Sequence, residues 1–193
     1  MRVVGGALRG RRLKAPPGLG VRPTSDRARE ALFNLLAHGA ALGGVRLEGA
    51  VVLDAFAGTG ALGIEALSRG AARAIFVESD RAALAALRAN LRALDQGDRA
   101  LVVARDATHP GAPPAPSSIA FLDPPYGSGL AAPALAALAA AGWLAAGALA
   151  VVEHGARERL EAPTGFTAIE QRRYGAGVLT FLRWDRAASP ESD

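Results

Sequence analysis

The sequence contains no cysteine, a single lysine and few aromatic residues, which make up 5% of its 193 positions. The absence of cysteine excludes disulfides, thiolate zinc sites, iron–sulfur clusters and cysteine nucleophiles. No apolar run reaches the roughly 18 residues of a membrane-spanning helix, and residues 1–13 lack the apolar core of a signal peptide. We therefore expect a soluble, cytoplasmic protein without a membrane partner, and at this length a single domain.

Positive charge is concentrated at the start of the chain. Residues 1–30 contain eight basic and two acidic residues, a net charge of +6, whereas the remainder carries a net charge of −2. A cationic segment on a near-neutral body indicates contact with a polyanion, most simply nucleic acid. The alternative is an arginine-rich surface that only faces solvent, because one lysine among 22 basic residues indicates a general preference for arginine.

After Gly44, short apolar runs alternate with helical stretches. The apolar runs are Ala50–Leu53, Ala74–Val77, Leu101–Ala104, Ile119–Leu122 and Leu149–Val152. The helices predicted between them are Ala61–Ser68, Arg81–Leu94 and Pro133–Leu144. Continuous apolar runs suit strands that are covered on both faces, and their alternation with helices predicts βαβ units. We therefore predict an α/β fold with a mostly parallel, doubly wound sheet.

Both ends of the chain add to this body. The Gly5-Gly6 break and the glycines and prolines up to position 18 predict a small β-hairpin within residues 1–22. Capping side chains at Thr24–Asp26 precede a predicted helix whose apolar stripe is Ala28, Ala31, Leu32, Leu35 and Leu36. The sequence pattern of residues 167–184 predicts a C-terminal antiparallel hairpin. We place the main domain at 23–186 and a frayed tail at 187–193.

A carboxylate ends or closely follows each apolar run. These residues are Asp54, Glu78, Asp106, Asp123 and Glu153. In an open parallel sheet, ligands bind outside the carboxyl ends of the strands, so we expect these groups to gather at one edge. Any single one of them has a simpler alternative, which is to cap the helix that follows.

A glycine-rich turn follows Asp54 and leads into a predicted helix. Residues 58–63, GTGALG, match the dinucleotide fingerprint GxGxxG, which makes a nicotinamide-dependent dehydrogenase a competing interpretation. However, Asp54 and three further residues separate the apolar run from the first glycine. A pyrophosphate would also be repelled by Asp54.

S-adenosylmethionine fits these residues better, because it carries an ammonium, a carboxylate and a ribose. Asp54 is suited to hold its amino group, and the free N–H groups of the glycine-rich turn its carboxylate. Glu78 is placed to accept the ribose hydroxyls, and Asp106 with Ala107 to bind the adenine. The predicted cofactor-binding residues are Asp54, Phe56, Gly58, Thr59, Gly60, Glu78, Ser79, Asp106 and Ala107.

The segment Asp123-Pro124-Pro125-Tyr126 directly follows the fourth apolar run. Two consecutive prolines fix φ and remove two donors, so the turn offers acceptors, the Asp123 carboxylate and the Pro124 carbonyl. Acceptors suit the exocyclic amine of a base, because two N–H···O bonds draw its nitrogen toward a nucleophilic geometry and stabilise charge that develops during methyl transfer. Tyr126 supplies a face for base stacking. We predict that all four residues are catalytic; the alternative is an ordinary Asp-Pro loop.

Several conspicuous side chains are not expected to be functional. The three histidines are scattered without metal-ligand spacing, so we predict no metal site. Trp143 and Trp184 are expected to pack in the core or against the sheet. We expect Arg172-Arg173 to lie on a solvated edge, the alternative being a contact with RNA.

Together these segments resemble the bacterial RsmD-type methyltransferases, which modify the N2 amino group of a guanine in 16S ribosomal RNA. The resemblance covers roughly residues 1–184 and is carried by residues 5–13 (GGALRGRRL), 22–34 (RPTSDRAREALFN), 54–70 and 123–126. It implies a Rossmann-like class I methyltransferase domain, S-adenosylmethionine as cofactor, and a 16S rRNA substrate within an assembling 30S subunit. It also implies an N-terminal hairpin that helps to hold RNA. The predicted RNA-binding residues are Arg9, Arg11, Arg12, Lys14, Arg22, Thr24 and Arg27.

Other functions remain as alternatives. An adenine-N6 methyltransferase also uses DPPY, but it usually needs a sizeable target-recognition region, and only about 40 residues follow the predicted parallel sheet. A glutamine-modifying methyltransferase would more often have Asn at position 123. An NAD(P)-dependent oxidoreductase and a non-catalytic RNA-binding assembly factor belong to other classes. Nothing in the sequence indicates an obligate partner, so we expect a monomer.

Overall fold

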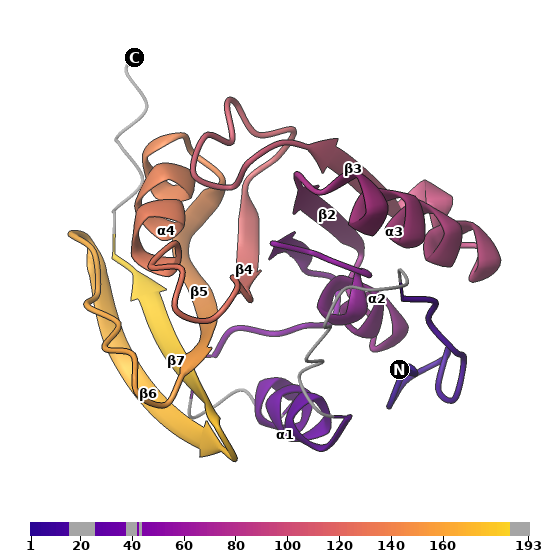
Figure 1. Cartoon of the computed structure of the whole chain (residues 1–193), viewed down its shortest axis with the longest axis horizontal. Coiled ribbons are helices and arrows are strands. Elements are labelled where there is room, and N and C mark those ends of the chain that lie inside the picture. Colours follow the sequence, from indigo (N-terminus) through magenta and orange to yellow (C-terminus); the bar gives the residue numbers. More distant parts are fainter. Residues whose placement is uncertain (16–25, 38–41, 43, 186–193) are drawn as a thin grey trace.

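The computed structural model describes residues 1–15, 26–37, 42 and 44–185, and its centre is a seven-stranded sheet (Figure 1). The strands are β1 (Val51–Ala55), β2 (Arg73–Glu78), β3 (Ala100–Ala104), β4 (Ser117–Leu122), β5 (Leu144–Gly155), β6 (Phe166–Tyr174) and β7 (Gly177–Trp184). The helices are α1 (Asp26–Ala37), α2 (Ala61–Ser68), α3 (Arg81–Ala93), the short 3-10 helix η2 (Gly97–Arg99) and α4 (Ala131–Ala140). The predicted mixed α/β fold is therefore confirmed.

The order of the strands locates a crevice. The sheet runs β3-β2-β1-β4-β5-β7-β6; β1 to β5 are parallel, whereas β7 is antiparallel to both β5 and β6. The chain adds β2 and β3 on one side of β1, then returns to place β4 on its other side. This reversal between β1 and β4 is a topological switch point, where open α/β sheets bind ligands. Asp54 lies on β1, and Asp123 directly follows β4.

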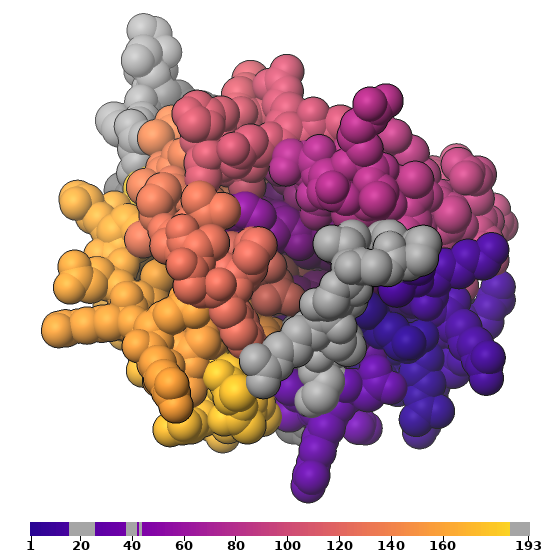
Figure 2. All heavy atoms as spheres, in the orientation of Figure 1, coloured from indigo at the N-terminus to yellow at the C-terminus, as the bar shows by residue number. Residues whose placement is uncertain are grey.

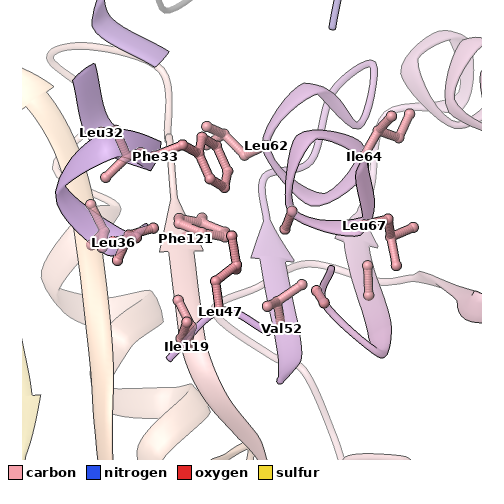
Figure 3. Close-up of a cluster of buried hydrophobic side chains, with 14 of the residues drawn as sticks. Leu32, Phe33, Leu36, Leu47, Val52, Leu62, Ile64, Leu67, Ile119 and Phe121 are labelled. Atoms are coloured by element: carbon pink, nitrogen blue, oxygen red, sulfur yellow. The ribbon is translucent and has the colours of Figure 1, made fainter. Parts of the chain in front are cut away.

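Helices cover both faces of the sheet. One face packs against α1, α2 and α3, and Figure 3 shows Phe33 of α1 beside Phe121 of β4, with their ring centroids 5.5 Å apart. The other face packs against α4 and the fully buried Trp143. Burying each large apolar side chain contributes about 1.5–3 kcal/mol, so the two layers fix the sheet that carries the crevice.

The predicted helix over residues 133–144 is wrong at its C-terminal end. Helix α4 ends at Ala140, and Gly142 adopts a left-handed φ of 84° while Trp143 N donates to the Leu138 carbonyl at 2.9 Å. This glycine cap stops the helix and lets β5 begin at Leu144. The alanine-rich sequence hides the boundary, because alanine favours the helix on both sides of it.

The N-terminal segment forms a minimal hairpin. Arg2 and Arg12 make one antiparallel bridge, Val3 N donates to the Arg11 carbonyl at 2.9 Å, and Leu13 N donates to the Met1 carbonyl at 3.1 Å. The hairpin-like pairing was predicted. The boundary at residue 22 lies outside the described residues, so the proposed domain division stays a prediction.

This hairpin packs directly onto helix α2. The carboxylate of the fully buried Glu65 accepts hydrogen bonds from Val4 N at 2.8 Å and Gly5 N at 2.7 Å. Gly6 has a φ of 73°, and a Cβ there would lie 1.9 Å from the Ser68 carbonyl oxygen. Two of the segments that carry the resemblance, residues 5–13 and 65–70, are therefore parts of one packed contact.

Candidate active site

Three carboxylates converge at the switch point. Asp54 is 1% exposed, and its Oδ2 accepts a hydrogen bond from Gly63 N at 2.8 Å. Burial raises the pKa of Asp54 well above its usual value, the Gly63 bond opposes this shift, and the nearby charges of Asp123 and Glu78 add to it. The strand-end acids of β1, β2 and β4 thus share one electrostatic environment, as the sequence predicts.

The glycine-rich turn combines left-handed backbone with close packing. Phe56, Gly58 and Gly60 have φ values of 60°, 55° and 83°. A Cβ on Gly60 would lie 2.4 Å from Leu87 Cδ1, and one on Gly63 would lie 2.3 Å from the Phe76 ring. Gly58 differs, because a Cβ there would meet only the Phe56 carbonyl oxygen at 4.0 Å. Close contact with Leu87 of α3 explains Gly60, and close contact of α2 with Phe76 of β2 explains Gly63. Open space beside the backbone distinguishes Gly58.

Glu78, at the end of β2, closes over this turn. Its Oε2 accepts from Gly58 N at 2.7 Å, and its Oε1 accepts from Ser79 N at 2.7 Å and Asp80 N at 2.8 Å. A carboxylate has about four lone-pair sites, so these three N–H groups leave it one further acceptor position. Glu78 therefore orders the turn while its carboxylate faces the crevice edge.

Asp106 and Ala107 extend the same edge beyond β3. Arg105 N donates to the Glu78 carbonyl at 3.0 Å, which holds the residues after β3 beside the end of β2. Asp106 is exposed, and its Oδ1 accepts from both the backbone N and the hydroxyl of Thr108 at 2.8 Å. These two bonds lower the pKa of Asp106, so it stays ionised at neutral pH. Ala107 is buried.

The Asp123–Tyr126 turn leaves the sheet beside β1. Asp123 N donates to the Ala55 carbonyl at 3.4 Å, Pro124 is buried, and Pro125 is exposed. Tyr126 is 37% exposed, and its hydroxyl donates to Glu153 Oε1 at 2.6 Å. The turn is therefore attached to the sheet on the β1 side and, through its tyrosine, on the β5 side.

A pocket of about 450 Å³ lies on the β5 side of this turn. Its lining residues are Gly155, Ala156, Arg157, Glu158, Arg173, Gly175 and Ala176. Glu158 Oε1 accepts from Gly127 N at 2.7 Å, so the residue after Tyr126 is bound to the pocket wall. Glu153 was noticed as a strand-end acid, but its bond to Tyr126 and the role of Glu158 were not predicted, since no short sequence pattern joins residues about 30 positions apart.

Most predicted RNA-binding residues that the structure describes are exposed on or near the N-terminal hairpin. Arg9, Arg12, Lys14 and Arg27 are exposed, as is Arg11, whose Nη2 donates to the Ala93 carbonyl at 2.8 Å. Arg22 and Thr24 lie outside the described residues.

Two other basic residues of the region are paired with acids. Arg2 and Arg29 lie 3.3 Å and 2.8 Å from carboxylate oxygens of Asp26, and Arg29 is buried. The net charge of +6 therefore overstates the positive charge offered to a partner. Neither a cluster of three metal-ligating side chains nor a helix able to cross a membrane occurs in the described part of the chain.

Asn90 of α3 joins the hairpin to the glycine-rich turn. Its Oδ1 accepts from Lys14 N at 2.8 Å, while its Nδ2 donates to the carbonyls of Lys14 and Thr59 at 3.0 Å. Asn90 is buried, so both sides of this bridge are held without exchange to water. No sequence motif marked it.

The chain is clearly similar in sequence to known proteins. Residues 1–183 match the protein family described as "Conserved hypothetical protein 95". The chain belongs to this family. It is 38% identical over 193 residues to ribosomal RNA small subunit methyltransferase D of Escherichia coli, covering 100% of this chain and 93% of that relative. The resemblance to the RsmD-type family is thereby confirmed.

Solved structures agree with the family assignment. The structure of Escherichia coli yhhF superposes with a TM-score of 0.80 at 38% identity, over 96% of this chain and 98% of that one. An RNA methyltransferase from Salinibacter ruber, solved with S-adenosyl-L-homocysteine, has a TM-score of 0.61 at 14% identity, over 89% of this chain and 99% of that one. The fold is that of class I methyltransferases, as the sequence predicts.

Proposed function

We propose that the protein transfers a methyl group from S-adenosylmethionine to the N2 amino group of a guanine in 16S rRNA. The observation that carries the proposal is the Asp123–Tyr126 turn, an acceptor-only corner that leaves β4 beside the buried Asp54 at the switch point. The similarity to a named small-subunit rRNA methyltransferase supports the substrate class. We further propose that the protein acts as a monomer in the cytoplasm on an assembling 30S subunit.

The residues at the strand ends fit the proposed cofactor. Open space beside Gly58 admits a ligand to the backbone, and Asp54, Glu78 and Asp106 follow one another along the crevice edge. When bound, S-adenosylmethionine supplies an electrophilic methyl group on a sulfonium. Asp54 holds its ammonium, Glu78 with Ser79 binds the ribose hydroxyls, and Asp106 with Ala107 binds the adenine.

This assignment requires a change of partner at Gly58. Glu78 already accepts three N–H groups and has about one acceptor position left, which is too few for two ribose hydroxyls. Release of Gly58 N–H from Glu78 frees one carboxylate position. The released N–H then binds the cofactor carboxylate, together with that of Thr59, whereas the Gly60 N–H donates to the Ala57 carbonyl at 2.7 Å within the turn. This single change of hydrogen-bond partner therefore provides an acceptor for the ribose and a donor for the carboxylate of the cofactor.

The catalytic turn orients the amine of the base. The Asp123 carboxylate and the Pro124 carbonyl accept hydrogen bonds from the two N–H groups of the amine, which leaves the nitrogen lone pair directed toward the crevice. Because Pro124 and Pro125 carry no N–H, no donor competes for that lone pair. The Asp123 charge stabilises positive charge as it develops on the nitrogen, and the Tyr126 ring stacks on the base.

Labelled methyl transfer tests this function. Purified protein and labelled S-adenosylmethionine are incubated with free 16S RNA and with 30S particles, and the label is located by mass spectrometry. We expect it on guanine N2; label on adenine N6 would instead favour the adenine-modifying alternative.

Two variants isolate the role of Asp123. Asp123→Ala should bind the cofactor but lose turnover, whereas the control Asp98→Ala, at an exposed acid of η2, should retain it. Unchanged turnover in Asp123→Ala would contradict the assigned role.

A further inference from the structure

We propose that the pocket lined by residues 155–158, 173, 175 and 176 binds a phosphate of the RNA strand next to the target nucleotide, through Arg157 and Arg173. This inference rests on the proposed function and adds a second RNA contact, on the opposite side of the catalytic turn from the N-terminal hairpin. We refer to it as the β5–β7 pocket.

The two walls of the β5–β7 pocket are hydrogen-bonded to each other, and its volume suits a small ligand. It lies between the segment that ends β5 and the turn between β6 and β7, and Ala156 N donates to the Ala176 carbonyl at 2.9 Å, which joins the two walls. Its volume of about 450 Å³ lies within the range of small-ligand sites. One nucleotide is a ligand of that class.

Its two arginines differ from their sequence neighbours. Arg159 lies 3.9 Å from Glu161, and Arg172 lies 2.6 Å from Glu170, so each has an acidic partner. Arg157 and Arg173 have no carboxylate within ion-pair distance among the described residues; Arg173 Nε contacts only the Gly175 carbonyl, at 3.4 Å.

These two arginines therefore bring two positive charges to a pocket that has one lining carboxylate, that of Glu158. The acidic lining residue, Glu158, directs its Oε1 to Gly127 N rather than to them. Two exposed guanidinium groups beside a concave backbone surface suit a phosphate, which accepts their planar hydrogen-bond donors.

The pocket adjoins the catalytic turn. Glu158 binds Gly127, the residue after Tyr126, and a Cβ on Gly177 at the start of β7 would lie 2.8 Å from the Tyr126 hydroxyl oxygen. In the sheet, β4 lies between β1, against which α2 packs with the hairpin, and β5 with β7 (Figure 1). Figure 2 shows the hairpin in indigo and the C-terminal strands in orange and yellow on opposite sides of one face. RNA held at both places passes over the turn.

Two charge-matched double variants test the proposal on the full-length protein. Arg157→Gln with Arg173→Gln removes the pocket charges, and the control Arg159→Gln with Arg172→Gln removes two charges from the same segments. Affinity for a 16S RNA fragment containing the target is measured over a range of salt concentrations. We expect the pocket variant to reduce the magnitude of the slope of log affinity against log salt by about 0.7, the value for one phosphate contact on a single strand. The control should leave the slope near that of the unmodified protein.

Three outcomes would overturn the proposal. An equal loss of RNA affinity in both double variants would indicate that only the overall charge of the protein matters. No loss of RNA affinity in either variant would show that the pocket does not contact RNA. Slower methyl transfer to 30S particles by the pocket variant, with unchanged binding to free RNA, would indicate that the pocket contacts a protein partner instead. Calorimetric binding of S-adenosylmethionine checks that both variants are folded. Because RNA binding is measured without turnover, this result is independent of whether methyl transfer occurs at guanine N2.

Discussion

The hydroxyl of Tyr126 donates a 2.6 Å hydrogen bond to Glu153 Oε1 and thereby attaches the Asp123–Tyr126 turn to strand β5. A tyrosine that stacks on a base needs its ring plane fixed before the base arrives, because ordering it on binding costs conformational entropy. Glu153 supplies that constraint from β5, a strand that is separated from β1 by β4 in the sheet. The proposed cofactor-binding residues and the Tyr126–Glu153 pair thus lie on opposite sides of the switch point.

Loss of this hydrogen bond should slow methyl transfer while leaving the ring in place. We expect Tyr126→Phe and Glu153→Ala each to lower kcat/KM for RNA about tenfold, the effect of roughly 1.4 kcal/mol. If Glu153 acts through Tyr126, the double variant should be no worse than either single one. Glu153→Gln, which keeps an acceptor, should recover part of the activity. Additive losses would show that Glu153 acts elsewhere.

Gly177 allows this arrangement because it has no side chain. A Cβ there would lie 2.8 Å from the Tyr126 hydroxyl oxygen and 3.1 Å from Glu153 Oε1. Gly177→Ala should therefore displace Tyr126 and reduce turnover by a factor of at least about ten, while cofactor affinity measured by calorimetry stays unchanged. The control is Gly97→Ala, since a Cβ at that position meets no atom within 4 Å. Full activity in Gly177→Ala would mean that the tyrosine position is not critical.

Removal of the Glu65 carboxylate should destabilise the whole domain. Its oxygens accept from Val4 N, Gly5 N and Arg69 Nε, at 2.7–2.8 Å, and the residue is fully buried. Glu65→Ala removes the acceptor of these half-buried donors and the carboxylate that lies 3.8 Å from the buried Arg29 guanidinium, which should cost about 3–5 kcal/mol of unfolding free energy. Urea denaturation measures this change. The exposed Glu161→Ala should change stability by less than about 0.5 kcal/mol, and an equally small effect for Glu65 would contradict the assigned role of the contact.

The buried Asp54 should make stability depend on pH in a defined direction. Burial raises its folded-state pKa above the usual 3.8, so folding favours the protonated form and ionisation opposes it. The favourable contribution of Asp54 to the stability of the fold is complete below pH 3.8, and it is lost as the pH rises through the folded-state pKa.

Asp54→Asn isolates this contribution. The variant should be more stable than the unmodified protein at pH 7, by about 1.4 kcal/mol for each unit of pKa change. The difference should shrink as the pH is lowered toward 4.5. Urea denaturation at several pH values measures it, and calorimetry should show weakened S-adenosylmethionine binding. A stability difference that does not vary with pH would contradict the assignment.

Local signals in the sequence were sufficient for much of the α/β core. Helix α2 occupies its predicted range, Ala61–Ser68, because Gly60 and Gly70 adopt left-handed conformations at its two ends. The acids after β2, β3 and β4 lie at one edge, since parallel strands bring their carboxyl ends together. Periodicity failed at residues 141–144, where alanine-rich helix and apolar strand have the same composition.

The long-range contacts could not be obtained from the sequence. Glu65, Asn90 and Glu158 bind residues 60, 76 and 31 positions away, respectively. Their partners are backbone N–H groups, which every residue except proline carries, so no pairing of residue types identifies them. Arg29 illustrates the same difficulty, because one guanidinium in a basic segment is buried whereas its neighbours face water.

The bonds between the N-terminal hairpin and Glu65 also impose an order on biosynthesis. Residues 4 and 5 are synthesised before their acceptor, Glu65, which follows about 60 residues later. Until Glu65 has been synthesised, the backbone N–H groups of residues 4 and 5 lack the acceptor that they have in the folded structure. A chain halted before α2 therefore lacks the carboxylate that holds the hairpin on the domain.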